Sequence, residues 1–292
     1  MKGEQAIGAS LRYFSLGNIT FTDANGNTIR DFKPNEFAFD VAYSRKLSEY
    51  FSGGITLRYI HSNLTGGTSV EGTDSKAGNS AAADISSFFQ KDIELGNKDA
   101  VLTAGINISN IGAKISYTET GTKNFLPTNL RLGPGLKLKL NEYNDLAFGL
   151  DINKLLVPTP PIYTQDSTNS ANDVILYGQD PDVGVPAGML QSFSDAPGGG
   201  KEELKEINLG FGMEYWYDKQ FAFRAGYFYE DKTKGNRKYF TLGAGLRYNV
   251  FGLDLAYLIP TDQRNPLENT LHFTLTFDFD AQDGGKSDKS AE

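Results

Sequence analysis

The stretch TLHFTLTFDF, residues 270–279, decides the fold class of this chain. Its apolar residues are Leu271, Phe273, Leu275, Phe277 and Phe279. Polar residues stand between them, and this alternation is the period of a β-strand with one apolar and one polar face. A tilted strand of this length crosses the hydrocarbon core of a bilayer. The stretch is therefore typical of the last strand of a bacterial outer-membrane barrel.

About a dozen segments of the chain predict strands of the same kind. In residues 129–140, leucines face one side, and Arg131, Lys137 and Lys139 face the other. The segment 80–90 is the weakest, because its alanines also tolerate a helix. The predicted strands are 6–21, 35–47, 51–62, 80–90, 100–110, 129–140, 145–156, 204–217, 221–230, 238–250, 251–260 and 270–279. This pattern predicts an all-β fold, a transmembrane antiparallel β-barrel.

The connections between these segments alternate between long and short. Long loops are predicted at 22–33, 63–79, 111–127, 157–201, 231–237 and 261–268, and a connection of moderate length at 91–99. Tight turns are predicted at 48–50, 141–144, 218–219 and 249–252. Transmembrane barrels have long extracellular loops and short periplasmic turns. We therefore expect the long loops outside the cell and the turns in the periplasm. The alternative is a soluble β-sandwich or a lipocalin-like barrel.

The amino-acid composition favours some classes of function and excludes others. The 292 residues include 32 Gly, 20 Phe and 15 Tyr, which suit small lumen-facing positions and interfacial aromatic girdles. No run of about 18 apolar residues predicts a transmembrane helix. A net charge of −8 argues against nucleic acid as a partner, and the absence of Cys excludes disulfide and thiolate chemistry.

The domain organisation follows from the same pattern. We expect one barrel domain over residues 1–279 and a polar periplasmic tail over residues 280–292. The first ten residues lack the ordered charged and apolar regions of a secretory signal. An outer-membrane protein needs such a signal, so we expect the sequence to lack its natural beginning.

Charged residues recur on the polar face of the predicted strands. They are Asp40, Arg58, Arg131, Lys137, Lys139, Asp151, Glu214, Arg224, Arg247 and Asp254. One interpretation is that they face the lumen and pair with one another in a wet barrel. The other interpretation is a polar permeation path.

The sequence offers few candidates for catalytic or metal-ligating residues. The chain has two histidines, His61 and His272, and neither is placed by the predicted strands to complete a Ser–His–acid triad facing lipid. No Cys/His cluster has the spacing of a metal site. We therefore expect neither an enzyme nor a cofactor or metal.

The 157–201 loop is the strongest candidate for a partner-binding surface. It is far longer than a connection between neighbouring strands requires. It also carries apolar residues, which a merely solvated loop does not need. The candidate partner-binding residues are Val174, Ile175, Leu176, Tyr177, Val183, Val185, Met189, Leu190 and Phe193. The same residues could instead pack against neighbouring loops or close the mouth of the barrel.

Five segments of the chain together resemble one protein family. They are AIGASLRYFSLGNITFTD (6–23), NEFAFDVAYSRKLSEYFSGGITLRYIHSNL (35–64), GNKDAVLTAGINISNIGAKISY (96–117), FLPTNLRLG (125–133) and DINKLLVPTPP (151–161). The chain is similar over nearly its whole length to PorV, also called LptO. This family is the outer-membrane component of the type IX secretion system of Bacteroidota.

The resemblance implies a fold and a function. The fold is that of FadL fatty-acid transporters, a barrel of about 14 strands, of which this sequence supplies about 12. An N-terminal segment and about two strands are then expected to be missing. The implied function is to bind secreted cargo and shuttle it to the cell-surface attachment complex. The implied partners are a SprA/Sov-like translocon barrel, secreted proteins with C-terminal signal domains, a PorU-like sortase attachment complex and outer-membrane lipid.

Two other functions stay open at this point. One is a FadL-like transport pore for hydrophobic small molecules, which an apolar pocket in the lumen would favour. The other is a lipid A-modifying outer-membrane protein, which a lipid-facing His–Ser pair would favour.

Overall fold

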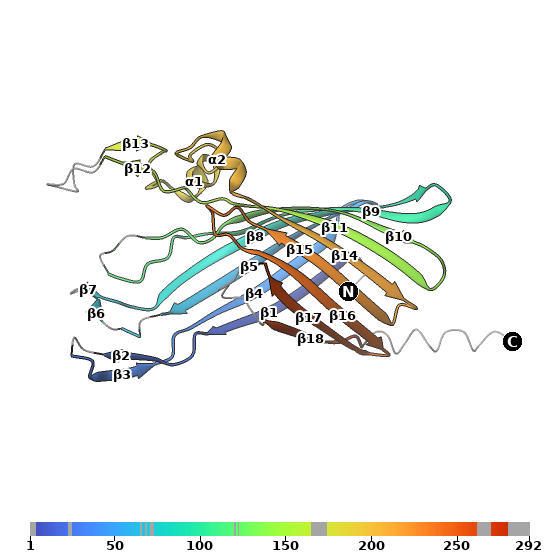
Figure 1. The fold of residues 1–292 in the computed structure, drawn as a ribbon, viewed down its shortest axis with the longest axis horizontal. Coiled ribbons are helices and arrows are strands. Elements are labelled where there is room, and N and C mark those ends of the chain that lie inside the picture. The colour runs from blue at the N-terminus through green and yellow to red at the C-terminus, as the bar shows by residue number, and fades with distance from the viewer. Residues whose placement is uncertain are drawn as a thin grey trace. The chain divides into compact units, whose positions relative to one another are not determined.

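The computed structural model describes residues 4–22, 25–64, 66–67, 69–70, 73–119, 121, 123–164, 174–261 and 270–279. Most of them belong to one antiparallel sheet of 12 strands, so the all-β fold and the strand number predicted from the sequence are confirmed. The strands follow one another in the sheet in the order of the chain, β1-β4-β5-β8-β9-β10-β11-β14-β15-β16-β17-β18 (Figure 1). They are β1 (Gln5–Ser15), β4 (Asn35–Lys46), β5 (Phe51–Asn63), β8 (Gly78–Leu95), β9 (Lys98–Gly112), β10 (Asn129–Lys139), β11 (Asn144–Leu155), β14 (Ile207–Tyr217), β15 (Phe221–Tyr229), β16 (Lys238–Tyr248), β17 (Phe251–Pro260) and β18 (Leu271–Phe277).

The chain divides into two compact units. Unit 1 comprises Met1–Phe88, Ile106–Arg131 and Lys154–Leu204. Unit 2 comprises Phe89–Gly105, Leu132–Asn153 and Lys205–Glu292. The boundaries run across β8, β9, β10 and β11, so these four strands contribute residues to both units.

In unit 1 the two faces of the sheet carry residues of opposite kinds. Val41 and Leu57 face each other in the β4–β5 register, and Leu57 is 65% exposed. The next pair in the register, Asp40 and Arg58, lies on the other face, and Asp40 is only 6% exposed. A protein folded in water buries its apolar side chains and exposes its charges. The reversed arrangement is the one that a sheet facing lipid requires.

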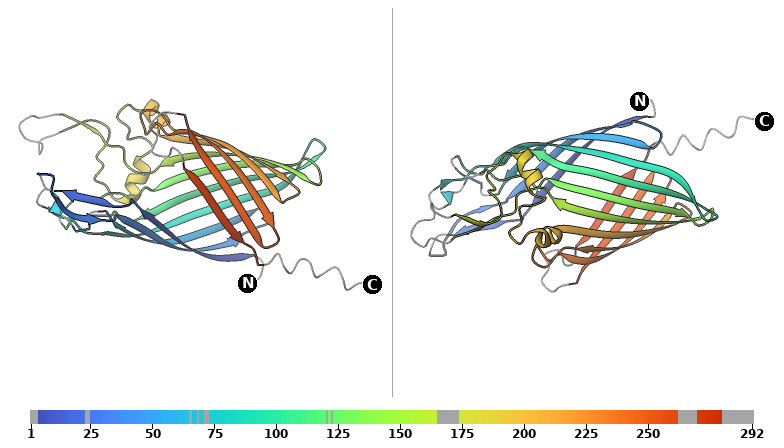
Figure 2. Two further views of the ribbon diagram at one scale, coloured as in Figure 1. Left: turned by 60° about the horizontal axis from the view of Figure 1, so that its bottom comes forward. Right: turned by 90° about the horizontal axis from the view of Figure 1, so that it is seen from above.

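Unit 2 has the same reversal. Its strands β14 to β18 run side by side (Figure 2). Leu255 pairs with Phe273 in the β17–β18 register, and both side chains are exposed. Asp254 pairs with Thr274 on the opposite face. The alternation that predicted the last strand therefore corresponds to two chemically different faces.

Unit 1 also has a small apolar core. Ala82, Ile115 and Leu126 are buried together, with Ile60 and Tyr117 packed against them. This core joins β5 and β8 to the connection between β9 and β10, so packing holds the predicted 111–127 loop at Ile115, Tyr117 and Leu126.

The predicted first strand, 6–21, is wrong in its extent. β1 ends at Ser15, and Gly17 follows with a φ of +78°, which breaks the strand. A separate hairpin follows, formed by β2 (Ile19–Thr22) and β3 (Thr28–Phe32). It occupies part of the predicted 22–33 loop, and Arg30 stacks on its two phenylalanine rings.

The predicted 91–99 connection is also wrong. β8 and β9 continue into this segment and leave a tight turn at Gly96, whose φ is +64°. The polar residues that suggested a loop are strand residues near this turn. The 80–90 segment is a strand and not a helix.

Ordered elements also lie in the loops predicted at 63–79 and 157–201. The first contains β6 (Ser69–Val70) and β7 (Thr73–Asp74). The second contains β12 (Ile162–Tyr163), β13 (Ile175–Tyr177) and α1 (Val185–Gln191). α2 (Gly200–Lys205) follows, so β14 begins at Ile207 and not at Leu204. No helix among the described residues has the length and apolarity to cross a membrane. The predicted tail, 280–292, and most of the predicted 261–268 loop lie outside the described residues.

The two faces of β18 predict different costs for the same substitution. Leu275→Arg places a charge on the apolar face and should cost about 2–4 kcal/mol near the bilayer midplane. Thr274→Arg places the same charge opposite Asp254 and should cost less than about 1 kcal/mol. Urea unfolding of both variants from lipid vesicles measures the difference. Equal destabilisation would show that the two faces of β18 have the same environment.

Candidate functional site

The described part of the chain after β11 forms a folded platform in unit 1, which we call the outer segment, residues 156–164 and 174–204. Its hairpin β12–β13 and its helices α1 and α2 gather in one region (Figures 1 and 2). Asp195 and Ser192 are fully buried within it, and the backbone N–H of Thr159 donates to Asp195 Oδ2 at 3.1 Å. The segment therefore has its own polar interior, which a solvated loop would lack.

Two further contacts fix the outer segment to the rest of unit 1. Lys154 Nζ, at the end of β11, lies 3.0 Å from Glu203 Oε2, and both side chains are almost fully buried. Glu203 Oε1 accepts a hydrogen bond of 2.8 Å from the backbone N–H of Ala196. In α1, Gly188 packs so closely on Phe125 that an added Cβ would lie 2.8 Å from the ring. The platform is therefore held both by a buried ion pair and by backbone packing.

The structure separates the nine predicted partner-binding residues into two groups. Ile175, Val183, Val185 and Met189 are half-buried. The exposed residues are Val174, Leu176, Tyr177, Leu190 and Phe193, and Leu190 has the highest exposure at 76%. We call these five the outer apolar residues.

Sequence reasoning missed three apolar side chains of the same region. Ile162 and Tyr163 are exposed on β12, where Ile162 pairs with Tyr177. Leu204 is exposed in α2. The adjacent Ile162 and Tyr163 after three prolines were a usable signal, because an apolar pair between turn residues indicates a short strand.

In unit 1 the polar face of the sheet centres on Arg58. Its Nε lies 2.6 Å from Asp40 Oδ1, and its NH2 lies 2.9 Å from Asp84 Oδ2. Its NH1 also donates to the side chain of Asn110. Arg12 on β1 reaches Asp40 at 3.0 Å, so two arginines balance two carboxylates. This cluster, the Arg58 network, joins five strands of unit 1, β1, β4, β5, β8 and β9.

Asp84 and Asn110 were not predicted as members of this network. Asp84 lies in the segment whose strand pattern was weakest. Asn110 has a φ of +60°, and this backbone conformation lets its N–H donate to Asp84 Oδ1 at 2.8 Å. Alternation alone does not reveal such a contact, because it depends on one left-handed residue.

In unit 2 a second network forms around Arg224. Arg224 lies 2.5 Å from Glu214 and 2.7 Å from Asp254, and Asp254 also pairs with Arg247 at 2.7 Å. The single tryptophan of the chain, Trp216, donates to Glu214 at 2.6 Å. Both arginines stack on its ring at 5.5 Å. This Arg224 network is also electrically balanced.

The ten predicted polar-face charges have different positions. Six belong to the two networks: Asp40, Arg58, Glu214, Arg224, Arg247 and Asp254. Lys137 pairs with Asp145 at 2.8 Å, and Lys139 lines the cavity described below. Asp151 lines a second hollow, and Arg131 is exposed at the start of β10.

A clamp holds the connection between β15 and β16 in unit 2. Glu230 is almost fully buried and accepts hydrogen bonds from Arg237 Nε at 2.8 Å and Arg237 NH2 at 2.6 Å. Burial by itself raises the pKa of Glu230, but the hydrogen bonds and charge of Arg237 outweigh it and hold this pKa below its usual value. The carboxylate therefore stabilises the connection in its ionised form.

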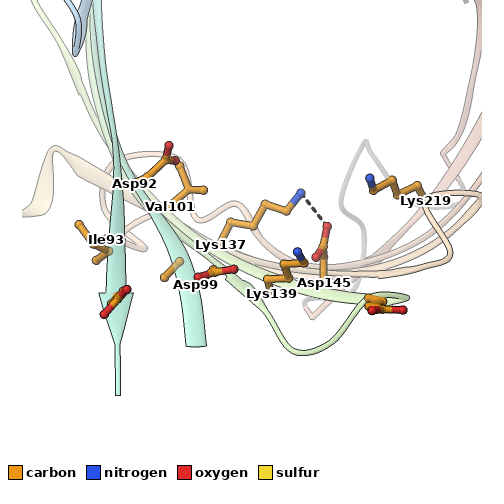
Figure 3. A pocket seen from close by; sticks show the side chains of 11 residues that line it. Asp92, Ile93, Asp99, Val101, Lys137, Lys139, Asp145 and Lys219 are labelled. Carbon is orange, nitrogen blue, oxygen red and sulfur yellow. Dashed lines mark ion pairs between the residues drawn. The ribbon is translucent and has the colours of Figure 1, made fainter. Parts of the chain in front are cut away.

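A cavity of about 850 Å³ lies at the turn end of unit 2, beside the tight turns that follow β8, β10 and β14. Lys137, Lys139 and Asp145 line it from β10 and β11, and Lys219 lines it from the β14–β15 turn (Figure 3). Further lining residues come from β8 and β9 and include Asp92 and Asp99. With Glu94 and Glu142, five carboxylates and three lysines line the cavity, so its lining carries more negative than positive charge.

A second hollow of about 570 Å³ lies over glycines of β10, β11, β14 and β15. A Cβ added at Gly149 or Gly212 would meet no atom within 4 Å, so these positions leave the space open. The stacked rings of Phe228 and Tyr239, 5.0 Å apart, line the same hollow. Asp151, Glu214 and Arg224 also line it, so its border is partly charged.

The two histidines have different surroundings. His61 Nδ1 lies 2.8 Å from Asn79 Oδ1, and its ring stacks on Phe37 at 5.0 Å. His272 lies on β18 opposite Ala256. Among the described residues, no group of three or more His, Asp and Glu side chains is placed to hold a metal ion.

The first half of the chain is similar in sequence to a known protein family. A family model described as "Type IX secretion system protein PorV" matches residues 1–162. A search of curated proteins finds no match. Among solved structures, the toluene transporter TodX of Pseudomonas putida is similar, with a TM-score of 0.45 and 12% sequence identity. That match covers 94% of this chain and 78% of the transporter chain.

The Arg58 network predicts a large cost for removing its central cation. Arg58→Met leaves Asp40 and Asp84 facing each other on a buried surface and should cost about 3–5 kcal/mol of unfolding free energy. The control Arg12→Met removes a cation that is 63% exposed and should cost less than about 1 kcal/mol. Denaturant unfolding of the two variants gives both values. Similar values would mean that Arg58 is not the centre of the network.

The Glu230 clamp predicts a pH dependence. Because its pKa is lowered by folding, the clamp stabilises the β15–β16 connection above the usual glutamate pKa and is lost as the pH falls through the lowered value. Amide hydrogen exchange in residues 231–237 should therefore accelerate at acid pH, after correction for the intrinsic rate. In Glu230→Gln it should already be fast at pH 7. A wild-type exchange profile in this variant would exclude the clamp.

Proposed function

Because this chain belongs to the PorV family of the type IX secretion system, we propose that it binds secreted cargo or the translocon and delivers cargo to the cell-surface attachment complex. Family membership makes it an outer-membrane component of that system. The partners we propose are a translocon barrel, secreted proteins with C-terminal signal domains and a sortase-containing attachment complex. The sheet would be the platform in the membrane, and the outer segment would make the contact.

The observation that carries this proposal is the exposure of the outer apolar residues on a folded surface. Leu190 lies in the last turn of α1 and Phe193 just after it, and the buried Ser192 caps this helix end with its backbone N–H. Leu176 and Tyr177 lie on β13, which is paired with β12. Apolar side chains exposed on a rigid surface mark partner sites, since binding them orders few additional groups.

The orientation of the chain is part of the proposal. We place the outer segment outside the cell and the tight turns in the periplasm, as in other transmembrane barrels. The outer apolar residues would then lie where cargo leaves the translocon.

The hollow over the glycines favours a second candidate, a pore for hydrophobic small molecules. Phe228 and Tyr239 give it an aromatic wall, and Gly149 and Gly212 leave room for a ligand. An apolar border would suit a hydrophobic ligand better than this charged border does. We therefore place this function second.

The role of the outer apolar residues in binding can be tested without changing the fold. The double variant Leu176→Asp/Leu190→Asp alters two exposed side chains and leaves the buried interior of the outer segment intact. We expect the protein to insert at the wild-type level and cargo on the cell surface to fall about tenfold or more, because hot-spot side chains each contribute about 2 kcal/mol or more. Surface labelling of cargo and heat-modifiability of the barrel measure the two quantities.

The matched control is Lys201→Asp, which places an acid in the same segment without removing an apolar side chain. It should leave surface cargo unchanged. Wild-type surface cargo in the double variant would contradict the proposal. The pore function predicts that outcome, because the double variant does not touch the hollow.

A further inference from the structure

A row of residues on the polar face of unit 2 crosses the neighbouring strands β11, β14, β15 and β16. Gly210 on β14 pairs with Phe228 on β15, and Phe228 pairs with Tyr239 on β16. On the other side of β14, a Cβ added at Gly210 would lie 3.4 Å from the Cβ of Asp151 on β11. Because neighbouring strands lie about 4.8 Å apart, Asp151 and Phe228 are about 10 Å apart, with a glycine between them.

The carboxylate of Asp151 is the unbalanced charge of the hollow that lies over this row. The charged residues that line the hollow are Asp151, Glu214 and Arg224. Arg224 pairs with Glu214 and with Asp254, and Arg247 neutralises the second of these carboxylates. Asp151 is half-buried and has no ion-pair partner in the part of the chain that the structure describes. The lining of the hollow therefore carries one net negative charge.

The other end of the row is an aromatic wall. The rings of Phe228 and Tyr239 stack 5.0 Å apart with an angle of 15° between their planes, and both line the hollow. Arg237 lies over the Phe228 ring at 5.9 Å, and its charge is balanced by the ion pair with Glu230 at 2.6 Å. Both rings are half-buried, so each keeps some of its surface accessible. The wall therefore offers ring surface to an apolar group.

We propose that this hollow binds a small organic ammonium compound with an aromatic body. The ammonium group donates hydrogen bonds to the Asp151 carboxylate, and the body lies over Gly210 with its ring against Phe228 and Tyr239. Hydrogen bonds between ionised groups are about twice as strong as those between neutral groups, and ring stacking adds to them. An anion finds no matching partner, because Arg224 is already neutralised. The volume of about 570 Å³ is in the range of small-molecule sites.

This site is separate from the proposed secretion role and differs from a pore for hydrophobic molecules. The outer apolar residues lie in unit 1, whereas every residue that lines the hollow lies in unit 2. A hydrophobic pore would accept a neutral aromatic compound as readily as a charged one. The ammonium site instead requires a positive charge at one end of the ligand.

Three probes that differ in their charged end test this requirement. Isothermal titration calorimetry on the full chain in lipid nanodiscs uses 4-phenylbutylammonium as the cation, 4-phenylbutanol as the neutral compound and 4-phenylbutanoate as the anion. Empty nanodiscs give the contribution of partitioning into lipid. We expect the ammonium compound to bind about tenfold or more tightly than either of the others, because it alone can pair with Asp151.

Two variants assign the binding to the row. Asp151→Asn keeps the shape of the side chain and should weaken ammonium binding about tenfold. Gly210→Val fills the space between Asp151 and Phe228 and should weaken it at least as much, while valine suits a strand. The matched controls are Asp99→Asn, an exposed carboxylate of β9, and Gly8→Val on β1, where an added Cβ meets no atom within 4 Å. Both controls should bind the ammonium compound as the wild type does.

Each contrary result overturns the proposal. If the wild type does not bind 4-phenylbutylammonium, the hollow is not an ammonium site. Equal affinity for 4-phenylbutanol would also exclude that site and would favour the hydrophobic pore. Wild-type affinity in Asp151→Asn and Gly210→Val would place the binding elsewhere. The measurement uses purified protein and no cargo, so its outcome is independent of the secretion assay.

Discussion

Pairing of charged side chains on the polar face of the strands is the interaction on which the rest of the structure depends. A sheet that exposes Leu57 and Phe223 on one face must place its polar residues on the other. Arg58, with a side chain that is only 9% exposed, is tolerated there because Asp40 and Asp84 neutralise it. Arg224 and Asp254 do the same in unit 2. Each unit therefore carries paired charges on the face of the sheet opposite its exposed apolar residues.

Alternation made most of the sheet predictable. It located 12 strands and distinguished the faces of β4, β5, β17 and β18, because the side-chain period of a strand is independent of what lies around it. It failed where a single backbone conformation decides the structure. Gly17 divides the predicted first strand, and Gly96 makes a tight turn inside a predicted connection.

The candidate sites were predictable only in part. The charges at Asp40, Arg58 and Arg224 stood out by their position in the alternation. Asp84 and Asn110 did not, because their role depends on how neighbouring strands are aligned in register and on one positive φ. In the outer segment, apolar composition predicted a surface, but only the fold shows that Leu190 is exposed while Met189 is half-buried.

The two faces of β4 allow the most direct test of the inverted sheet. The chain has no cysteine, so single cysteines at positions 38–44 can carry spin labels without background. Collision rates with oxygen, which concentrates in lipid, should alternate with a period of two in bilayers, with maxima at positions 39, 41 and 43. Maxima at positions 40 and 42, or rates that do not alternate, would contradict a sheet with its apolar face toward lipid.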